Sequence, residues 1–142
     1  MPNRKEIKEY PPNYEQIKET FPVESTDNVV FTYGDTLYNP HKLKITEDLW
    51  LHEEVHQKQQ VDPKQWWDMY CENEQFRLDQ ELEAYGRQYA YIKSLPIITK
   101  ERRTFLDFIS EILSSNLYGN IISFKVAESK IRNKAKKYET TN

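Results

Sequence analysis

The sequence predicts an α+β fold that is mainly helical and contains one small β-hairpin. Three observations lead to this prediction. Helix-start signals and helically spaced apolar residues recur along most of the chain after residue 46. A short β-branched and aromatic run, closed by Gly34-Asp35, comes before them. The length of 142 residues suits one hydrophobic core, so we expect a single domain over residues 1–142.

The β-hairpin is predicted from residues 29–38. Residues 29–33 read VVFTY, a composition with high β propensity, and Gly34-Asp35 then supplies a turn. Residues 36–38 read TLY and stop before Asn39-Pro40. We therefore expect two short antiparallel strands directly before the first long helix.

The helices are predicted from their start and stop signals. Thr46 is followed by two acidic residues that suit the helix dipole, and this helix should run to residue 59 or 60. Asp62-Pro63 starts a short second helix, with Asp62 as the N-cap and Pro63 at the first helical position. Further helices are expected at residues 73–94, 99–113 and 121–138.

The chain divides into three predicted segments within the single domain. Residues 1–22 are charged and interrupted by prolines, so we expect an N-terminal arm with short helices at residues 5–10 and 14–20. Residues 28–94 form the core that carries the candidate site. Residues 99–138 form the C-terminal helices.

Composition excludes several classes of function. A net charge of -3 gives no overall basic field, so no nucleic acid partner is expected. Cys71 is the single cysteine, so no intramolecular disulfide can form, and we interpret it as a buried thiol. The N-terminus lacks the apolar stretch of a signal peptide, and the longest uncharged stretch, residues 112–124, is too short for a bilayer of about 30 Å. We therefore expect no membrane association.

The stretch LHEEVHQKQQ carries the candidate chemistry. His52 and His56 stand four residues apart in the middle of a predicted helix, where side chains at this spacing lie about 40° apart and can reach one ion. Zinc is commonly bound in this way. Glu53 lies beside His52, where it can take a proton from a zinc-bound water. The pattern also arises by chance on an ordinary solvated helix, so a third ligand is needed to decide.

The predicted helix at residues 73–94 offers Glu74, Glu81 and Glu83 as third ligands. Its apolar face is marked by Leu78, Leu82, Tyr85, Tyr89 and Ile92. At roughly 100° per residue, Glu81 lies about 60° from the centre of that face and Glu83 about 140° away. Glu81 is therefore our first choice, Glu83 is the first substitute, and Glu74 lies near the helix start.

The segment Glu81-Leu82-Glu83-Ala84, following an H-E-x-x-H helix, resembles the small gluzincin zinc metallopeptidases. The same residues are similar to compact zincin-like proteins of bacteriophages and prophages, and the resemblance covers about residues 31–91. It implies a zincin-like minimal domain with His52, His56 and Glu81 as zinc ligands and Glu53 as the base. It also implies that the predicted hairpin provides a strand edge for peptide substrates.

The resemblance implies a zinc-dependent peptidase, in which Glu53 activates a zinc-bound water to hydrolyse a peptide or protein substrate. Such a protein would work in the cytoplasm of a host cell or in a virion. A non-catalytic zincin-fold module in a virion or another protein assembly is the alternative. A helical adaptor without metal is a third reading, which requires Glu81 to face water.

Several residues near the motif are given secondary roles. Trp66, Trp67 and Tyr70 are predicted to pack in the core rather than line a substrate groove. His41 is predicted to be a loop residue, and Gln59 lies near His56 in helical rotation. The group that would stabilise an oxyanion is unassigned, although the phenols of Tyr38, Tyr85 and Tyr89 are candidates.

Overall fold

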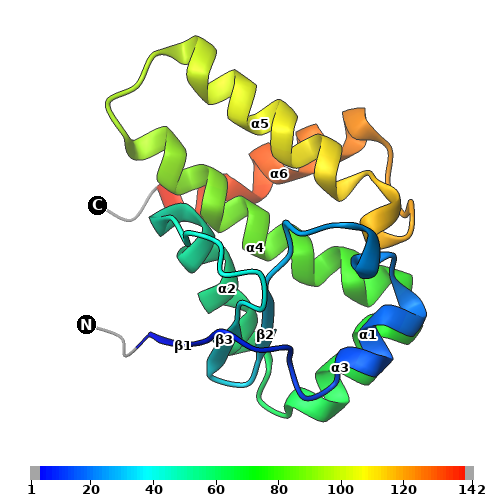
Figure 1. Cartoon of the computed structure of the whole chain (residues 1–142). Coiled ribbons are helices and arrows are strands. Elements are labelled where there is room, and N and C mark those ends of the chain that lie inside the picture. The colour runs from blue at the N-terminus through cyan, green and yellow to red at the C-terminus, as the bar shows by residue number, and fades with distance from the viewer. Residues whose placement is uncertain (1–3, 140–142) are drawn as a thin grey trace.

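The computed structural model describes residues 4–139, and its fold is α+β and mainly helical, as predicted (Figure 1). The helices in this part of the chain are α1 (Tyr14–Thr20), α2 (Glu47–Gln59), α3 (Pro63–Glu72), α4 (Glu74–Ser94), α5 (Thr99–Leu113) and α6 (Phe124–Glu139). The strands are β1 (Lys5–Ile7), β2 (Phe31–Tyr33) and β3 (Thr36–Tyr38). Two short 3-10 turns are η1 (Val23–Ser25) and η2 (Asn116–Tyr118).

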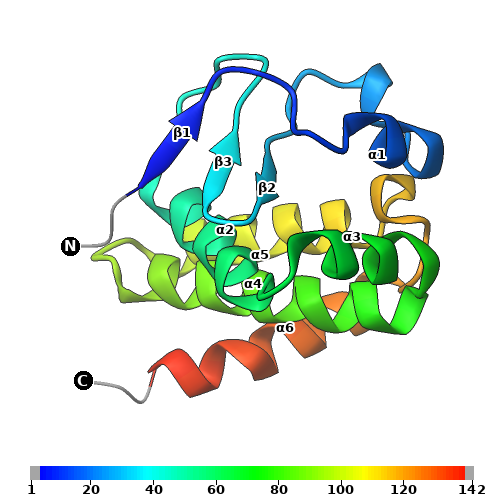
Figure 2. The ribbon, with the colours of Figure 1, turned by 90° about the horizontal axis from the view of Figure 1, so that it is seen from below.

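The strands form one small sheet in the order β1-β3-β2, which lies over the helices (Figure 2). β2 and β3 are antiparallel, so the predicted hairpin is confirmed. Gly34 turns the chain between them with a φ of +64°, in the left-handed region that glycine adopts without steric cost. Because the strand order is β1-β3-β2, β2 lies at one edge of the sheet.

The helix predicted at residues 5–10 is wrong, because this segment contains strand β1. β1 runs parallel to β3 and pairs with the side of β3 that β2 leaves free. The pairing is continued by the Asn39 N–H, which donates to the Ile7 carbonyl at 2.8 Å, and Lys5 Nζ lies 3.1 Å from Asp35 Oδ2. The main chain of β3 thus decides the conformation of a charged segment that has little β propensity of its own.

The predicted boundaries of the other helices are mostly confirmed. The carboxylate of Asp62 caps α3 by accepting from the Gln65 N–H at 3.1 Å, and Asn73 caps α4 by accepting from the Phe76 N–H at 2.9 Å. The last helix begins at Phe124 rather than at residue 121. Gly119 and Asn120 have φ values of +93° and +56°, so the chain turns at this point before it can start a helix.

Helix α4 is the centre of the molecule and packs against α2, α3, α5 and α6 (Figure 1). One apolar core lies between α4, α5 and α6, and the other joins α1, α3 and β2. Trp66, Trp67 and Tyr70 belong to the second core and are 5%, 7% and 5% exposed, so their predicted core packing is confirmed. None of the helices in residues 4–139 combines the length and hydrophobicity needed to cross a bilayer.

The contact between α4 and α6 can be tested at Gly86. A Cβ at this position would lie 2.7 Å from Lys134 Cβ and 3.2 Å from the Ala135 main-chain nitrogen. At a solvent-exposed position inside a helix, a Gly→Ala substitution raises the free energy of unfolding by about 1 kcal/mol. We expect Gly86→Ala instead to lower the free energy of unfolding by about 1–3 kcal/mol, because the helices must move apart. Urea denaturation followed by circular dichroism measures this, and a stabilised variant would contradict the packing.

Candidate metal centre

Helix α2 buries a polar face instead of an apolar one. His52, Glu53 and His56 are the buried residues of this helix, with exposed fractions of 4%, 6% and 5%. Their face packs on α4, where Glu81 is 3% exposed. Burying several ionisable groups is costly unless they bind one another or an ion. The four side chains therefore form a candidate site rather than a solvated helix surface.

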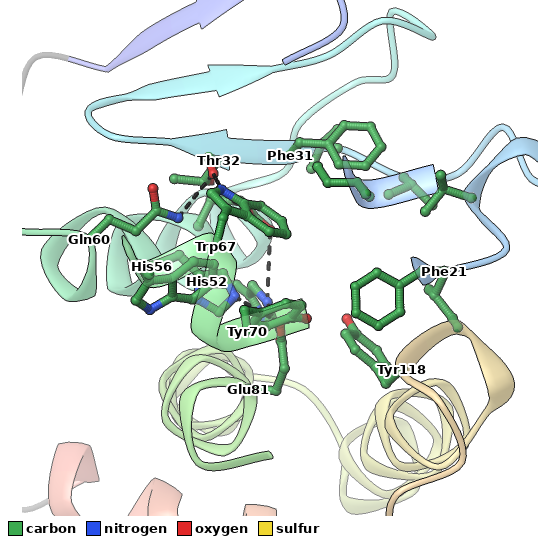
Figure 3. Close-up of a pocket in the computed structure, with 17 residues that line it drawn as sticks. Phe21, Phe31, Thr32, His52, His56, Gln60, Trp67, Tyr70, Glu81 and Tyr118 are labelled. Carbon is green, nitrogen blue, oxygen red and sulfur yellow. Dashed lines mark hydrogen bonds and ion pairs between the residues drawn. The ribbon is translucent and has the colours of Figure 1, made fainter. Parts of the chain in front are cut away.

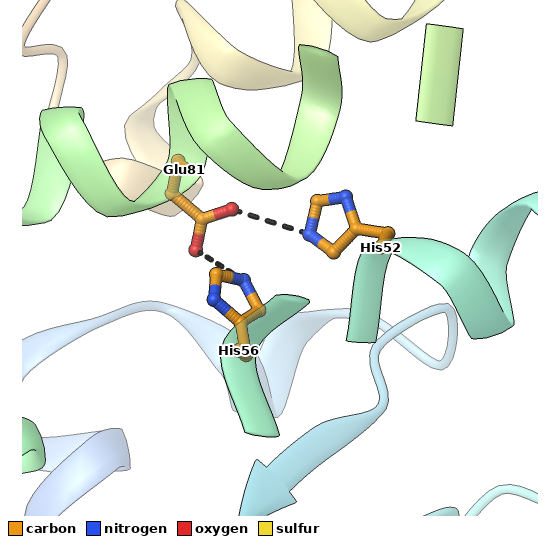
Figure 4. A group of neighbouring side chains, drawn as sticks. All are labelled: His52, His56 and Glu81. Carbon is orange, nitrogen blue, oxygen red and sulfur yellow. Dashed lines mark ion pairs between the residues drawn. The ribbon is translucent and has the colours of Figure 1, made fainter. Parts of the chain in front are cut away.

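Glu81 is the glutamate that meets the two histidines. Its carboxylate points between the two rings, with Oε1 3.3 Å from His52 Nε2 and Oε2 3.3 Å from His56 Nε2 (Figure 4). The possible ligand atoms of the three residues lie within 4.8 Å of one another. Because α4 packs along α2, the histidines at i and i+4 and this carboxylate reach one point. The three side chains could hold a metal ion.

The other glutamates of α4 lie away from the cluster. Glu83 faces α6, where Lys137 and Tyr138 donate to its carboxylate at 2.7 Å and 2.8 Å. Glu74 is exposed at the start of the helix. Of the three candidates from the sequence, only Glu81 approaches both imidazoles in the described structure. Glu81 does not face water, which the interpretation as a metal-free helical adaptor required.

A glutamine fixes the orientation of the His52 ring. The Gln88 amide donates from Nε2 to the Asp48 carboxylate at 2.8 Å, so its Oε1 faces His52 Nδ1 at 2.9 Å. An amide oxygen only accepts, so the hydrogen of the neutral imidazole must lie on Nδ1. The Nε2 lone pair of His52 then points at Glu81.

A second glutamine does the same for His56. Gln59 Nε2 donates to the main-chain carbonyl of Gln80 at 3.1 Å, and its Oε1 accepts from His56 Nδ1 at 2.8 Å. This assigns a role to Gln59, whose rotation near His56 is visible in the sequence. A metal-binding histidine usually donates a hydrogen bond from the ring nitrogen that does not face the metal, because this bond fixes the tautomer and the orientation of the ring.

The centre of the cluster is electron-rich and needs positive charge. Tyr70 donates its hydroxyl hydrogen to Glu81 Oε2 at 2.6 Å, while Glu81 Oε1 is buried without a hydrogen-bond donor among the described residues. Burial on its own lowers the pKa of His56, but the Glu81 carboxylate outweighs this effect and raises the pKa to about 9. Burial conversely raises the pKa of Glu81, and the imidazoles outweigh it, so the net pKa is lowered. A proton or a metal ion satisfies this arrangement.

Glu53 approaches the same point from the side of the sheet. Its Oε1 accepts from the Thr32 hydroxyl at 2.7 Å, and its Oε2 lies 3.8 Å from His52 Nε2. Thr32 belongs to β2, so the hairpin holds Glu53 in place. This carboxylate lies where it can bind a water molecule beside the cluster and take a proton from it.

The edge of β2 next to the cluster is already occupied. The Thr32 carbonyl accepts from Gln60 Nε2 and from Trp67 Nε1, both at 3.0 Å, which uses both of its lone pairs. Gln60 Oε1 also accepts from the Gly34 N–H at 2.7 Å. The carboxamide of Gln60 thus takes the place of a neighbouring peptide group. A substrate strand cannot pair with β2 at Thr32, although the predicted hairpin was expected to receive one.

A small cavity of about 80 Å³ lies against the cluster (Figure 3). His52, Glu53, His56 and Glu81 line it on one side, and aromatic side chains including Tyr70 and Tyr118 line it on the other. At about 30 Å³ for each water, the volume suits an ion and a few water molecules. It does not suit a large ligand.

Some site residues escape sequence reasoning. Tyr70 contacts Glu81 only because α3 folds back on α4, and no local sequence pattern predicts this contact. Gln88, in contrast, lies seven residues after Glu81, two turns along the same face, so helical spacing could have found it. Of the proposed phenols, Tyr85 packs on the His52 ring with 4.4 Å between centroids and shares a 2.8 Å hydrogen bond with Tyr118. Tyr89 lies in the apolar core.

Cys71 and His41 take no part in the cluster. Cys71 was predicted to be a buried thiol and is partly buried, and this burial raises the pKa of the thiol. His41 lies outside the regular elements, where its ring packs edge-on against Tyr10. His41 is therefore a loop residue, as predicted.

No protein-family model, curated protein or solved structure matches the chain. The likeness to small zinc metallopeptidases accordingly stays a prediction from the motif residues. What the fold adds is the meeting of His52, His56 and Glu81 in one buried cluster that could hold a metal ion.

Arg77 holds the aromatic side of the cavity together. This arginine is 5% exposed, and it donates to the carbonyls of Tyr70, Cys71 and Tyr118 at 2.8, 2.9 and 3.0 Å. It also stacks over the Phe21 ring at 4.8 Å. The guanidinium thus joins the end of α3 to η2 and places Tyr70 and Tyr118 beside the cluster.

We expect Arg77→Met to lower the free energy of unfolding by roughly 3 kcal/mol or more, since three buried carbonyls lose their donors at about 1 kcal/mol or more each. Arg77→Lys should recover only part of this loss, because an ammonium cannot reach three diverging acceptors. Urea denaturation measures both variants. Lys64→Met, which removes an exposed cation, serves as the control, and an equal effect of the two methionine variants would refute the proposed role of Arg77.

Proposed function

We propose that His52, His56 and Glu81 bind a zinc ion and that Glu53 acts as the base in zinc-dependent hydrolysis of peptide bonds. The observation that carries the proposal is the convergence of the two imidazole Nε2 atoms and the donor-free Glu81 Oε1 in one buried space. A proton on an imidazole would satisfy this point, and so would a cation with affinity for nitrogen and carboxylate ligands.

The ligand set favours zinc over the hard cations. Mg²⁺ and Ca²⁺ prefer oxygen ligands, whereas two imidazoles and one carboxylate suit zinc. Three protein ligands also leave a fourth position open, which distinguishes catalytic zinc from structural zinc. When bound, zinc lowers the pKa of a coordinated water to about 7 and polarises a substrate carbonyl. The small cavity, which His52, His56 and Glu81 line, would give a water molecule or substrate atom access to an ion held there.

The residues of the chain divide the work of the proposed reaction. Glu53 Oε2, held by the Thr32 contact to Oε1, receives the proton of the attacking water and returns it to the leaving amine. Gln88 and Gln59 keep the two imidazoles in the tautomer that leaves Nε2 free. Tyr70 keeps the Glu81 carboxylate turned towards them. Each donor and acceptor of the site is therefore oriented before a substrate arrives.

A non-catalytic metal module within a larger protein assembly, such as a virion, is the second candidate. The observation that favours it is burial, because none of the four site residues is more than 6% exposed. A structural ion would explain this closure. It would not explain Glu53, whose carboxylate is buried beside the cluster with a single hydroxyl donor. We therefore place hydrolysis first.

Metal analysis of protein purified without a His tag tests the ligands. We expect one zinc per chain and a rise in melting temperature with zinc but not with magnesium. Glu81→Gln should weaken zinc binding by more than about 100-fold. Losing a residue that only hydrogen-bonds to a metal ligand costs up to about 100-fold in metal affinity, and losing a ligand itself should cost more. Glu83→Gln, two residues further along α4, is the matched control and should bind zinc normally. Equal zinc binding by both variants would remove Glu81 from the ligand set.

Cleavage of a peptide library tests catalysis separately. Glu53→Gln should retain zinc and lose turnover by about 10²–10⁴-fold, because the base is gone and the ligands are intact. Glu54→Gln is the control, since its carboxylate meets Arg4 on the other side of α2. Mass spectrometry of the digests gives the rates. Zinc-loaded wild-type protein that cleaves nothing would leave the non-catalytic module as the function.

A further inference from the structure

A second and larger cavity reaches the cluster from the side of α5. Its volume is about 260 Å³, and its lining includes His52 and Glu53. We infer that this cavity, called the α5 cavity below, binds a bulky apolar side chain of the substrate next to the bond that is cleaved. The inference rests on the proposed function and adds the class of substrate to it.

The walls of the α5 cavity are chiefly apolar. Phe105, Phe108 and Ile112 come from α5, and Leu117 comes from η2. Phe108 is 58% exposed, and its ring centroid lies 6.3 Å from that of Phe105. An exposed aromatic residue at the rim of a concave apolar surface is typical of a ligand site. All four residues lie outside residues 31–91, so the motif resemblance says nothing about them.

The polar part of the α5 cavity lining includes the candidate catalytic group. Glu53 and His52 line this cavity and the small one, so both spaces border these two side chains. A side chain seated between Phe105, Phe108 and Ile112 would bring its own main chain towards Glu53. Its size and apolar character would then decide how well the neighbouring peptide bond is held.

The other routes to the cluster offer less room for a side chain. The small cavity has a volume of only about 80 Å³ and is walled by aromatic core residues. The edge of β2 is capped at Thr32 by Gln60 and Trp67. A substrate therefore approaches along α5. No lysine or arginine lines the α5 cavity, and its two carboxylates, Asp48 and Glu53, accept hydrogen bonds from Gln88 and Thr32. The favoured side chain is therefore apolar rather than charged.

The test separates binding from hydrolysis. Glu53→Gln protein, with and without added zinc, is titrated into fluorescein-labelled heptapeptides of glycine, serine and alanine that carry one central phenylalanine, alanine, lysine or aspartate. Fluorescence anisotropy gives the affinities. We expect the phenylalanine peptide to bind at least about 10-fold more tightly than the alanine peptide, the discrimination that one large apolar group provides.

A matched pair of variants locates the binding. Phe108→Glu, made in the Glu53→Gln background, should abolish the preference for phenylalanine, because it places a carboxylate at the apolar rim. Ile98→Glu makes the same change at a residue that is 62% exposed at the start of α5 and outside the cavity lining. It should leave the preference unchanged. Melting temperatures of both variants confirm that they are folded.

Each outcome bears on one of the two proposals. Equal affinity for the four peptides, no binding of any peptide, or an unchanged preference in Phe108→Glu would overturn the α5 cavity as the side-chain site. Wild-type protein that cleaves the peptides without preference would also overturn it, yet would support hydrolysis. Selective binding without cleavage by zinc-loaded wild type would keep the α5 cavity as a ligand site and reject hydrolysis.

Discussion

The structure depends on one electrostatic constraint, the meeting of two imidazole lone pairs and a carboxylate in a space that water barely reaches. Gln88 and Gln59 hold the outer nitrogens of His52 and His56, so both inner nitrogens face Glu81. Acceptors that face one another repel unless a positive charge lies between them. The contact between α2 and α4 therefore needs a positive charge, which a proton or a metal ion supplies.

The rest of the fold is arranged around that polar contact. Helix α2 has almost no apolar face, so the apolar burial is supplied by two separate cores on either side of it. Tyr85 of one core packs on His52, and Trp66 of the other packs on His56. The sheet contributes through Thr32, which binds Glu53. Two ordinary hydrophobic cores thus shield a polar centre from bulk solvent, which strengthens the interactions in it.

Much of this could be predicted from sequence because the signals are local. Asp62-Pro63 and Asn73 mark helix starts, Gly34-Asp35 marks the hairpin, and helical rotation distinguishes Glu81 from Glu83. The features that the sequence did not predict depend on contacts between segments that are far apart in the chain. Strand β1 exists only because β3 offers a free edge, and Tyr70 reaches Glu81 only because α3 folds back on α4. The α5 cavity joins segments far apart in the chain, so no spacing rule could reveal it.

X-ray absorption at the zinc edge of zinc-loaded protein is the most direct measurement of the central claim. We predict a first coordination sphere with two imidazole nitrogens at about 2.0–2.1 Å and a carboxylate oxygen at about 2.0–2.2 Å. The scattering from the outer atoms of two imidazole rings should be visible beyond it. A sphere of oxygen atoms without imidazole scattering would show that zinc binds elsewhere, and the account of the buried cluster would be wrong.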